Sequence, residues 1–272
     1  MQPGLGCVTP EQENLLNLNA SPVVIAAAFS LATAAAVPAL AQSEGPARNI
    51  VLVHGALVDG SGWRAVYDLL VADGYTVGVV QMPLTSLEDD VAATRRVLAR
   101  MEGPVVLVGH SYGGVVISVA GDDPDVSALV YVAALQPDAG ESLGEVSALA
   151  SPILPDDALV PSEDGFLILD PARFPEIFGA DLPSDVTAFM AVSQAPTAGA
   201  AFGAEIEAAA WRSKPSFGIV ATDDRTVNPE LQRLMYARSG ATVTEVQASH
   251  AVFISQPQAV ADVIEAAAGS IE

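Results

Sequence analysis

Residues 105–114 read VVLVGHSYGG, and this stretch says most about the fold. Its four leading apolar residues predict a short buried strand, and the apolar segment at 115–120 predicts a helix behind it. Between them, residues 109–113 match the pattern G-x-S-x-G with Ser111 at the centre. The pattern alone is weak, but a strand before it and a helix after it are the context of a nucleophile elbow. Flanking glycines fit because side chains would collide in so tight a turn.

On both sides of this stretch, apolar runs of strand length alternate with segments that have helical spacing. This alternation predicts an α/β fold with a mainly parallel sheet and helices on both faces. The expected strands are 50–53, 75–80, 105–108, 128–134, 217–221 and 242–246, and the expected helices are 63–72, 86–102, 115–120, 229–239 and 257–268.

The rhythm is interrupted between about 136 and 214, where prolines cluster, apolar runs are short and no strand is evident. We expect an insertion of loops and short helices there, acting as a cap over the site. The domain organisation is therefore a leader at 1–41 and one α/β domain at 42–272 that contains this cap.

The composition limits the classes of partner. Hydrophobic residues make up 51% of the 272-residue chain, and the formal net charge is −22, with 33 acidic and 11 basic residues. Such an acidic protein with no basic run is a poor partner for nucleic acid or for an anionic membrane. We expect a small-molecule substrate and a monomer or homodimer.

Residues 22–41 carry no charge and end in Ala39-Leu40-Ala41, an A-x-A site before Gln42. They predict a signal peptide cleaved near Ala41, and hence an exported protein without stable membrane association afterwards. Residues 1–21 contain acidic residues but no Lys or Arg, which is unusual for a signal peptide, and a single membrane anchor is the alternative. The only cysteine, Cys7, falls in the leader, so the mature chain is expected to have no disulfide and no thiolate metal site.

A serine nucleophile needs a base, and the base needs an orienting acid. Of the three histidines, His54 ends the first strand and His110 is too close to Ser111 in sequence to curl back onto it. His250 follows the last strand and is the expected base. The acid should follow a strand and precede the histidine, and Asp223 and Asp224 fit equally well by spacing.

Acyl transfer also needs an oxyanion hole. One donor is expected to be the backbone N–H of Tyr112, directly after the serine. The other is expected from the turn after the first strand, where Ala56 is the candidate and Gly55 lets the backbone approach a substrate. The alternative for His54 and Gly55 is an ordinary turn at a strand end.

With these residues in place, the chain resembles an α/β-hydrolase. More narrowly, it is similar to small bacterial carboxylesterases related to plant salicylate-type methylesterases and hydroxynitrile lyases. The stretches that carry the resemblance are VLVHGA, GHSYGG, ATDDRTVNPELQ and ASHAVFISQP, between residues 51 and 257. The resemblance implies that Asp224 is the acid of a Ser111–His250–Asp224 triad. It also implies Ala56 and Tyr112 as oxyanion donors, with neither a metal nor an organic cofactor.

Two departures narrow the expected chemistry. Hydroxynitrile lyases carry a lysine just after the catalytic histidine and a threonine at the position of Gly55, but Ala251 follows His250 in this chain. Cyanohydrin cleavage is therefore disfavoured. Haloalkane dehalogenases are also similar to this chain, but they need an aspartate at the position of Ser111. Dehalogenation is therefore disfavoured as well.

The expected function is hydrolysis of small carboxylic esters by a serine esterase through an acyl-enzyme. A lactonase, an amidase or a polyester hydrolase with the same triad is one alternative, and a non-catalytic ligand-binding or sensor protein on the same fold is another. The candidate substrate-binding residues are Gly55, Trp63 and Trp211. Candidates for the pocket lining, each with the core as its alternative, are Trp63, Phe166, Phe174, Phe178, Phe189 and Trp211.

Overall fold

The computed structural model describes residues 47–271. The predicted leader, its cleavage site at Ala41-Gln42 and Cys7 lie outside the described residues, so export stays a prediction. Within the described range, no helix combines the length and the apolar character needed to span a membrane.

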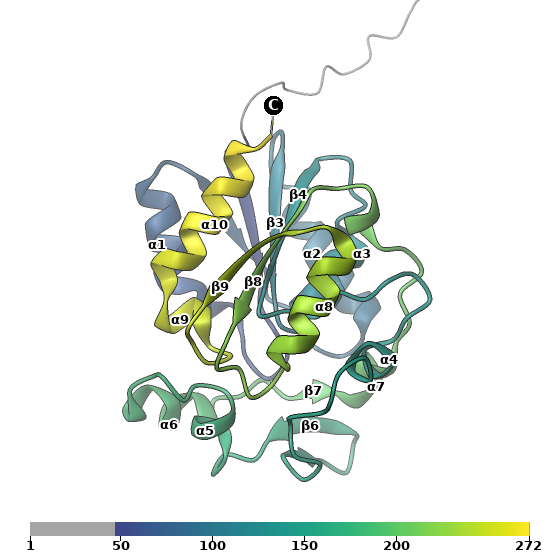
Figure 1. Ribbon diagram of the computed structural model, residues 1–272, viewed down its shortest axis with the longest axis vertical. Helices are drawn as coiled ribbons and strands as arrows, with labels where there is room; N and C mark the ends of the chain where they lie inside the picture. Colours follow the sequence, from purple (N-terminus) through teal and green to yellow (C-terminus); the bar gives the residue numbers. More distant parts are fainter. Residues whose placement is uncertain (1–46, 272) are drawn as a thin grey trace, which may run out of the picture. The chain divides into compact units, whose positions relative to one another are not determined.

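Six parallel strands form the central sheet, in the order β2-β1-β3-β4-β8-β9 (Figure 1). The chain runs from β1 outward to β2 and then crosses back to β3 on the other side. The carboxyl ends of β1 and β3 therefore border the point where strand order reverses, which is where open α/β sheets bind ligands. The strands are β1 Asn49–Val53, β2 Thr76–Val79, β3 Val105–His110, β4 Val126–Val132, β8 Ser216–Ala221 and β9 Thr242–Val246.

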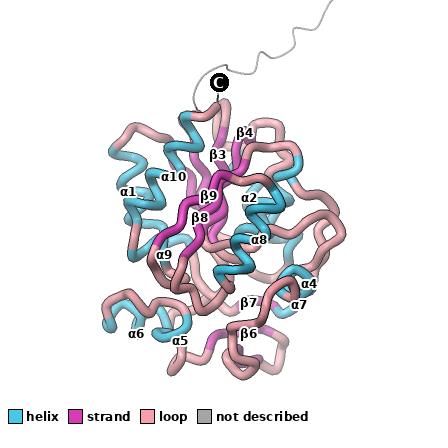
Figure 2. Tube along the Cα trace, viewed as in Figure 1, coloured by secondary structure: helices cyan, strands magenta, loops and turns pink. Residues whose placement is uncertain are grey.

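Helices cover both faces of this sheet, as the sequence predicts (Figures 1 and 2). One face carries α1 (Arg64–Ala72), entered through the 3-10 turn η1 (Gly60–Trp63), and α10 (Pro257–Gly269), with the short α9 (Val252–Ser255) before it. The other face carries α2 (Leu87–Leu98), α3 (Gly113–Ala120) and α8 (Pro229–Ser239). Alternate residues of each strand pack into the two cores: Ile50 and Leu52 on one side, Val51 and Val53 on the other.

The helix α2 begins as predicted but ends early. The Ser86 side chain caps it by accepting a hydrogen bond from the Asp89 N–H at 3.1 Å. The N–H groups of Arg100 and Met101 instead close tighter turns onto carbonyls three residues back, so the helix ends at Leu98 and not at the expected Glu102.

The segment between β4 and β8 is the insertion, and its predicted lack of strands is wrong. The short strands β5 (Leu159–Pro161), β6 (Phe166–Leu169) and β7 (Thr197–Ala198) form an antiparallel sheet, too short for periodicity to reveal. The helical parts are α4 (Leu143–Ser147), α5 (Phe174–Ile177), α6 (Ser184–Val192), α7 (Gly199–Gly203) and the 3-10 turn η2 (Ala210–Arg212). In Figure 1 the strands β6 and β7 and the helices α4, α5, α6 and α7 lie beyond the carboxyl ends of the central strands, where the sequence predicts a cap.

Candidate active site

Ser111 lies in a strained turn between β3 and α3. Its φ of 53° falls in the left-handed region, which non-glycine residues rarely adopt. The turn is tight because the neighbouring positions are glycines: a Cβ on Gly109 would come within 2.5 Å of the Gly113 carbonyl oxygen, and a Cβ on Gly113 within 2.6 Å of the His54 carbonyl oxygen. This is the strand–turn–helix geometry that a nucleophile elbow requires.

Three loops bring the predicted triad residues together at the carboxyl edge of the sheet. The Ser111 hydroxyl lies 2.8 Å from Nε2 of His250, which follows β9. Nδ1 of His250 lies 2.7 Å from Oδ2 of Asp224, which follows β8. All three side chains are buried. The geometry is that of a Ser–His–Asp triad, while the roles of the three groups in a reaction stay predictions.

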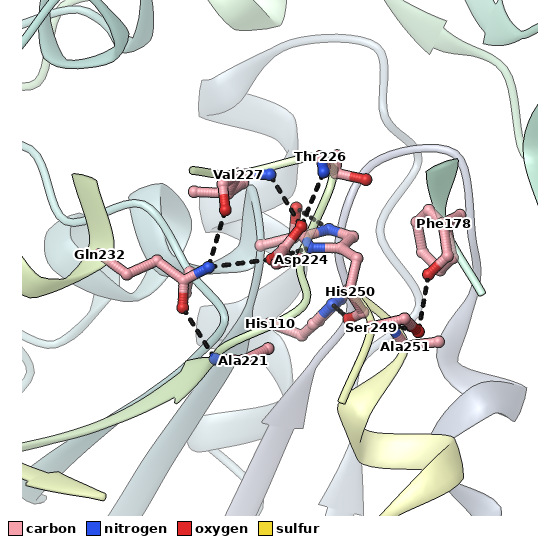
Figure 3. A network of polar contacts seen from close by, with 12 residues as sticks. His110, Phe178, Ala221, Asp224, Thr226, Val227, Gln232, Ser249, His250 and Ala251 are labelled. Atoms are coloured by element: carbon pink, nitrogen blue, oxygen red, sulfur yellow. Dashed lines mark hydrogen bonds and ion pairs between the residues drawn. The ribbon is translucent and has the colours of Figure 1, made fainter. Parts of the chain in front are cut away.

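Asp224 is held from several directions (Figure 3). Its Oδ1 accepts hydrogen bonds from the backbone N–H groups of Thr226 at 2.7 Å and Val227 at 2.9 Å. These contacts fix the orientation of the Asp224 side chain toward His250. The neighbouring Asp223 is exposed and lies outside this network, so the structure separates two candidates that spacing alone left equal.

Gln232 on α8 is a member of this network that sequence reasoning missed. Its Nε2 donates to Oδ2 of Asp224 at 2.9 Å, and its Oε1 accepts from the Ala221 N–H at 3.1 Å (Figure 3). The side chain therefore ties α8 both to the end of β8 and to the acid that follows it. The available signal was a polar residue on the buried face of a helix that directly follows the acid loop.

The other two histidines brace the site from within the core. Nε2 of His110 lies 2.9 Å from the His250 carbonyl oxygen and donates to it (Figure 3). Nε2 of His54 accepts from the Met82 N–H at 2.9 Å, so its Nδ1 is the protonated nitrogen and donates to the Gly55 carbonyl at 2.8 Å. Burial lowers the pKa of His54 and holds the pKa of His110 well below its ordinary value, so both rings stay neutral.

The turn after β1 approaches the serine closely. A Cβ on Gly55 would lie 2.9 Å from both the Ser111 Cβ and Nδ1 of His110, so a larger residue would displace the elbow. Within residues 47–271, no protein acceptor takes the backbone N–H of Ala56 or of Tyr112. These two groups, on either side of Ser111, are the donors that the sequence predicts for an oxyanion hole.

The model of the alpha/beta hydrolase family matches residues 50–263 of the chain. The chain belongs to this family. A pyrethroid hydrolase from Sphingobium wenxiniae is 29% identical, with 79% of this chain and 86% of that protein covered. Methylesterase 8 from Arabidopsis thaliana is 28% identical, with 69% of this chain and 76% of that protein covered.

Among solved structures, a pyrethroid hydrolase from Sphingobium faniae superimposes with a TM-score of 0.69 and 27% identity, covering 82% of this chain and 97% of its own. The comparisons confirm the α/β-hydrolase fold and the expectation of a hydrolase enzyme, and they support ester hydrolysis as its class of activity. They favour an enzyme over the non-catalytic sensor protein.

As expected for an alpha/beta hydrolase, a cavity opens above the serine, with a volume of about 320 Å³. Ser111 and His250 form its floor with Ala56 and Tyr112, and the cap supplies its roof. The remaining lining residues are Leu57, Leu135, Leu143, Ser147, Ser151, Pro152, Ile153, Leu154, Leu159, Phe178, Phe202, Thr226, Val227, Asn228 and Leu231.

The structure does not place Trp63, Trp211 or Gly55 in the lining of this cavity, so their predicted substrate-binding roles stay predictions. Trp63 is fully buried beneath the site, with its ring 4.8 Å from that of Phe253. Trp211 is also buried, and its Nε1 donates to the Pro137 carbonyl at 2.7 Å. Gly55 lies behind Ser111, where its lack of a side chain permits the close approach of the turn.

Among the other candidate aromatic residues, only Phe178 lines the cavity. Phe174 stacks on it with ring centroids 4.9 Å apart, and Phe189 is 70% exposed on α6. Phe166 lies at a separate surface hollow beside β5. Phe202 of α7 lines the cavity instead and was not foreseen, because α7 has too few residues to show a helical pattern.

No group of three or more metal-ligating side chains comes together in the part of the chain that the structure describes.

The burial of His54 and His110 predicts that the free energy of unfolding falls in acid. In the unfolded chain they bind protons near pH 6.5, whereas burial keeps them neutral in the fold, so unfolding becomes easier as the pH falls from 7 toward 5. A His110→Gln variant keeps a donor for the His250 carbonyl but cannot titrate. We expect its free energy of unfolding to fall less steeply, by up to about 1.4 kcal/mol per pH unit.

Denaturant unfolding of both proteins at pH 7, 6 and 5 measures this difference. Equal slopes for the wild type and His110→Gln would mean that His110 is not held neutral by burial.

Proposed function

We propose that this alpha/beta hydrolase is a serine esterase acting on small, uncharged carboxylic esters through a Ser111–His250–Asp224 triad. The observation that carries the proposal is the unbroken pair of contacts from the Ser111 hydroxyl to His250 at 2.8 Å and from His250 to Asp224 at 2.7 Å. A nucleophile, a base and an orienting acid in hydrogen-bond sequence are the arrangement that acyl transfer needs. Relatives named as esterases and hydrolases support the same class of reaction.

In the first half-reaction, the Ser111 oxygen attacks the ester carbonyl carbon while Nε2 of His250 takes the hydroxyl proton. The carbonyl electron pair moves onto its oxygen, which the N–H groups of Ala56 and Tyr112 stabilise. The pair then returns, the bond to the alkoxide breaks, and His250 delivers its proton to the leaving alcohol. Asp224 keeps Nδ1 of His250 protonated and stabilises the imidazolium that forms.

In the second half-reaction, water attacks the acyl group on Ser111, and His250 takes a proton from that water. The bond between the acyl carbon and the Ser111 oxygen breaks, and His250 returns the proton to the serine. The products are the carboxylic acid and the free enzyme. The strained turn at Ser111 presents the hydroxyl at the cavity floor, where both half-reactions take place.

The lining of the cavity favours an uncharged substrate. None of its described lining residues is a lysine, arginine, aspartate or glutamate, and most are aliphatic or aromatic. The polar groups are the short side chains of Ser147, Ser151, Thr226 and Asn228. A charged acyl or alcohol group would have to leave water without a partner of opposite charge, which is strongly unfavourable. The same triad would open a lactone or an activated amide that fits this cavity.

Removal of the nucleophile tests the proposal. Ser111→Ala should reduce kcat for a short p-nitrophenyl ester by about 10⁵–10⁶, as expected when a triad serine is lost. Asp224→Asn should reduce kcat by about 10⁴, because the amide no longer holds His250 in the required tautomer.

The matched control is Asp223→Asn, one residue away on the exposed side of the same loop, which should leave kcat within about twofold, because surface changes away from the site have small effects. Undiminished hydrolysis by Ser111→Ala would refute the proposed function.

A pair of esters of equal size tests the substrate class. Methyl 4-isopropylbenzoate and the monomethyl ester of terephthalic acid differ only by an isopropyl group against a carboxylate on the ring, and these two groups have the same number of heavy atoms. We expect kcat/KM for the charged ester to be lower by about 100-fold or more, because the apolar cavity offers the carboxylate no partner. Equal kcat/KM values for the two esters would exclude the apolar cavity as the binding site of the acyl group.

A further inference from the structure

The cap does more than roof the cavity, because β7 hydrogen-bonds directly to the turn that supplies Ala56. The Oγ1 atom of Thr197 accepts from the Leu57 N–H at 3.1 Å. The Ala195 N–H, just before β7, donates to the Leu57 carbonyl at 3.2 Å. Both backbone groups of Leu57 are thus held by β7 and the residue shortly before it, in a part of the chain about 140 residues away in sequence.

The hold on Leu57 matters because its backbone is strained. Its φ of 66° lies in the left-handed region, which is unfavourable for a non-glycine residue and persists only where the surroundings enforce it. The peptide group that carries the Leu57 N–H directly follows the peptide group that carries the Ala56 N–H. Fixing Leu57 therefore fixes the direction in which the Ala56 N–H points.

The same strand also reaches the other side of the serine. The Ala198 N–H donates to the Leu84 carbonyl at 2.8 Å, and the Leu84 N–H donates to Oδ1 of Asp90 at 2.8 Å. Oδ2 of Asp90 in turn accepts from the Tyr112 hydroxyl at 2.9 Å. Tyr112 supplies the second N–H beside Ser111, so β7 is linked to both predicted oxyanion donors.

Thr197 is suited to this role by its burial and by its own hydrogen bonds. It is fully buried, and its hydroxyl lies 3.4 Å from the Ala195 carbonyl, to which it donates. The hydroxyl oxygen therefore presents its lone pairs to Leu57. Replacing it by a methyl group would leave the buried Leu57 N–H without its acceptor, which is unfavourable for a donor removed from water.

From these contacts we infer that Thr197 is a positioning residue for the oxyanion hole: through Leu57, the cap strand β7 holds the Ala56 N–H toward the substrate carbonyl. The inference rests on the proposed esterase function of Ser111. It assigns the cap a part in transition-state stabilisation, whereas a cap that acts only as a roof would affect substrate binding.

The test compares Thr197→Val, which has the same shape but no hydroxyl, with Thr197→Ser, which keeps the hydroxyl. Activity is expressed per active site titrated, so that loss of folded protein is not counted. We expect Thr197→Val to lower kcat about tenfold with KM within about twofold, a smaller loss than the 10²–10³ seen when an oxyanion donor is removed outright. Thr197→Ser should recover most of the activity.

An aryl boronic acid, which forms a tetrahedral adduct on the serine, provides a second readout. Its affinity should fall in proportion to kcat/KM in Thr197→Val, because both depend on the oxyanion donors. The matched control is Thr187→Val: Thr187 is a buried cap threonine whose hydroxyl lies near only its own helix backbone, 3.2 Å from the Ser184 carbonyl. This variant should keep the wild-type kcat and boronate affinity.

Two results would overturn the inference: Thr197→Val with the wild-type kcat per site, or an equal loss in Thr197→Val and Thr187→Val. If the valine variant does not fold, Thr197→Ala against Thr197→Ser gives the same comparison, and equal kcat values for these two would overturn it as well. Failure of the proposed function is recognised separately, because Ser111→Ala would then remain active whatever Thr197 does.

Discussion

The tight turn at Ser111 is the constraint on which the rest of the site depends. A positive φ at a serine is unfavourable, and it persists because β3, α3 and the turn after β1 approach one another too closely for any other arrangement. Glycine at positions 109 and 113 permits this approach, because backbone carbonyl oxygens fill the space that a Cβ would need. With the serine fixed in this way, a base on the loop after β9 can reach it.

The surrounding histidines and the cap hold the groups that meet at this turn. His110 fixes the main chain of His250, and His54 fixes the carbonyl of Gly55, each as a neutral, buried ring. From the opposite side, β7 holds Leu57, and the ring of Phe178 packs edge-on against His250 at 4.9 Å. The insertion between β4 and β8 thus borders both the base and the oxyanion turn while closing the cavity above them.

The sequence predicts the central strands and helices much better than the strands of the cap and the contacts around the site. The helix at Pro229–Ser239 and the strand at Thr242–Val246 match their expected bounds, because a proline and a glycine mark the two ends of the helix and β-branched residues favour the strand. Strand β7 could not be predicted, since two residues show no period and its partners are distant in sequence. The contact made by Gln232 depends on tertiary packing, which no local pattern encodes.

Covalent labelling shows whether Ser111 is the nucleophile. A fluorophosphonate reacts with an activated serine and leaves a stable adduct whose position peptide mass spectrometry identifies. We expect a single labelled peptide that contains residues 109–114. Ester hydrolysis should be lost in proportion to the amount of label on Ser111. Hydrolysis that persists when Ser111 is fully labelled, or that disappears with a label on another residue, would contradict this expectation.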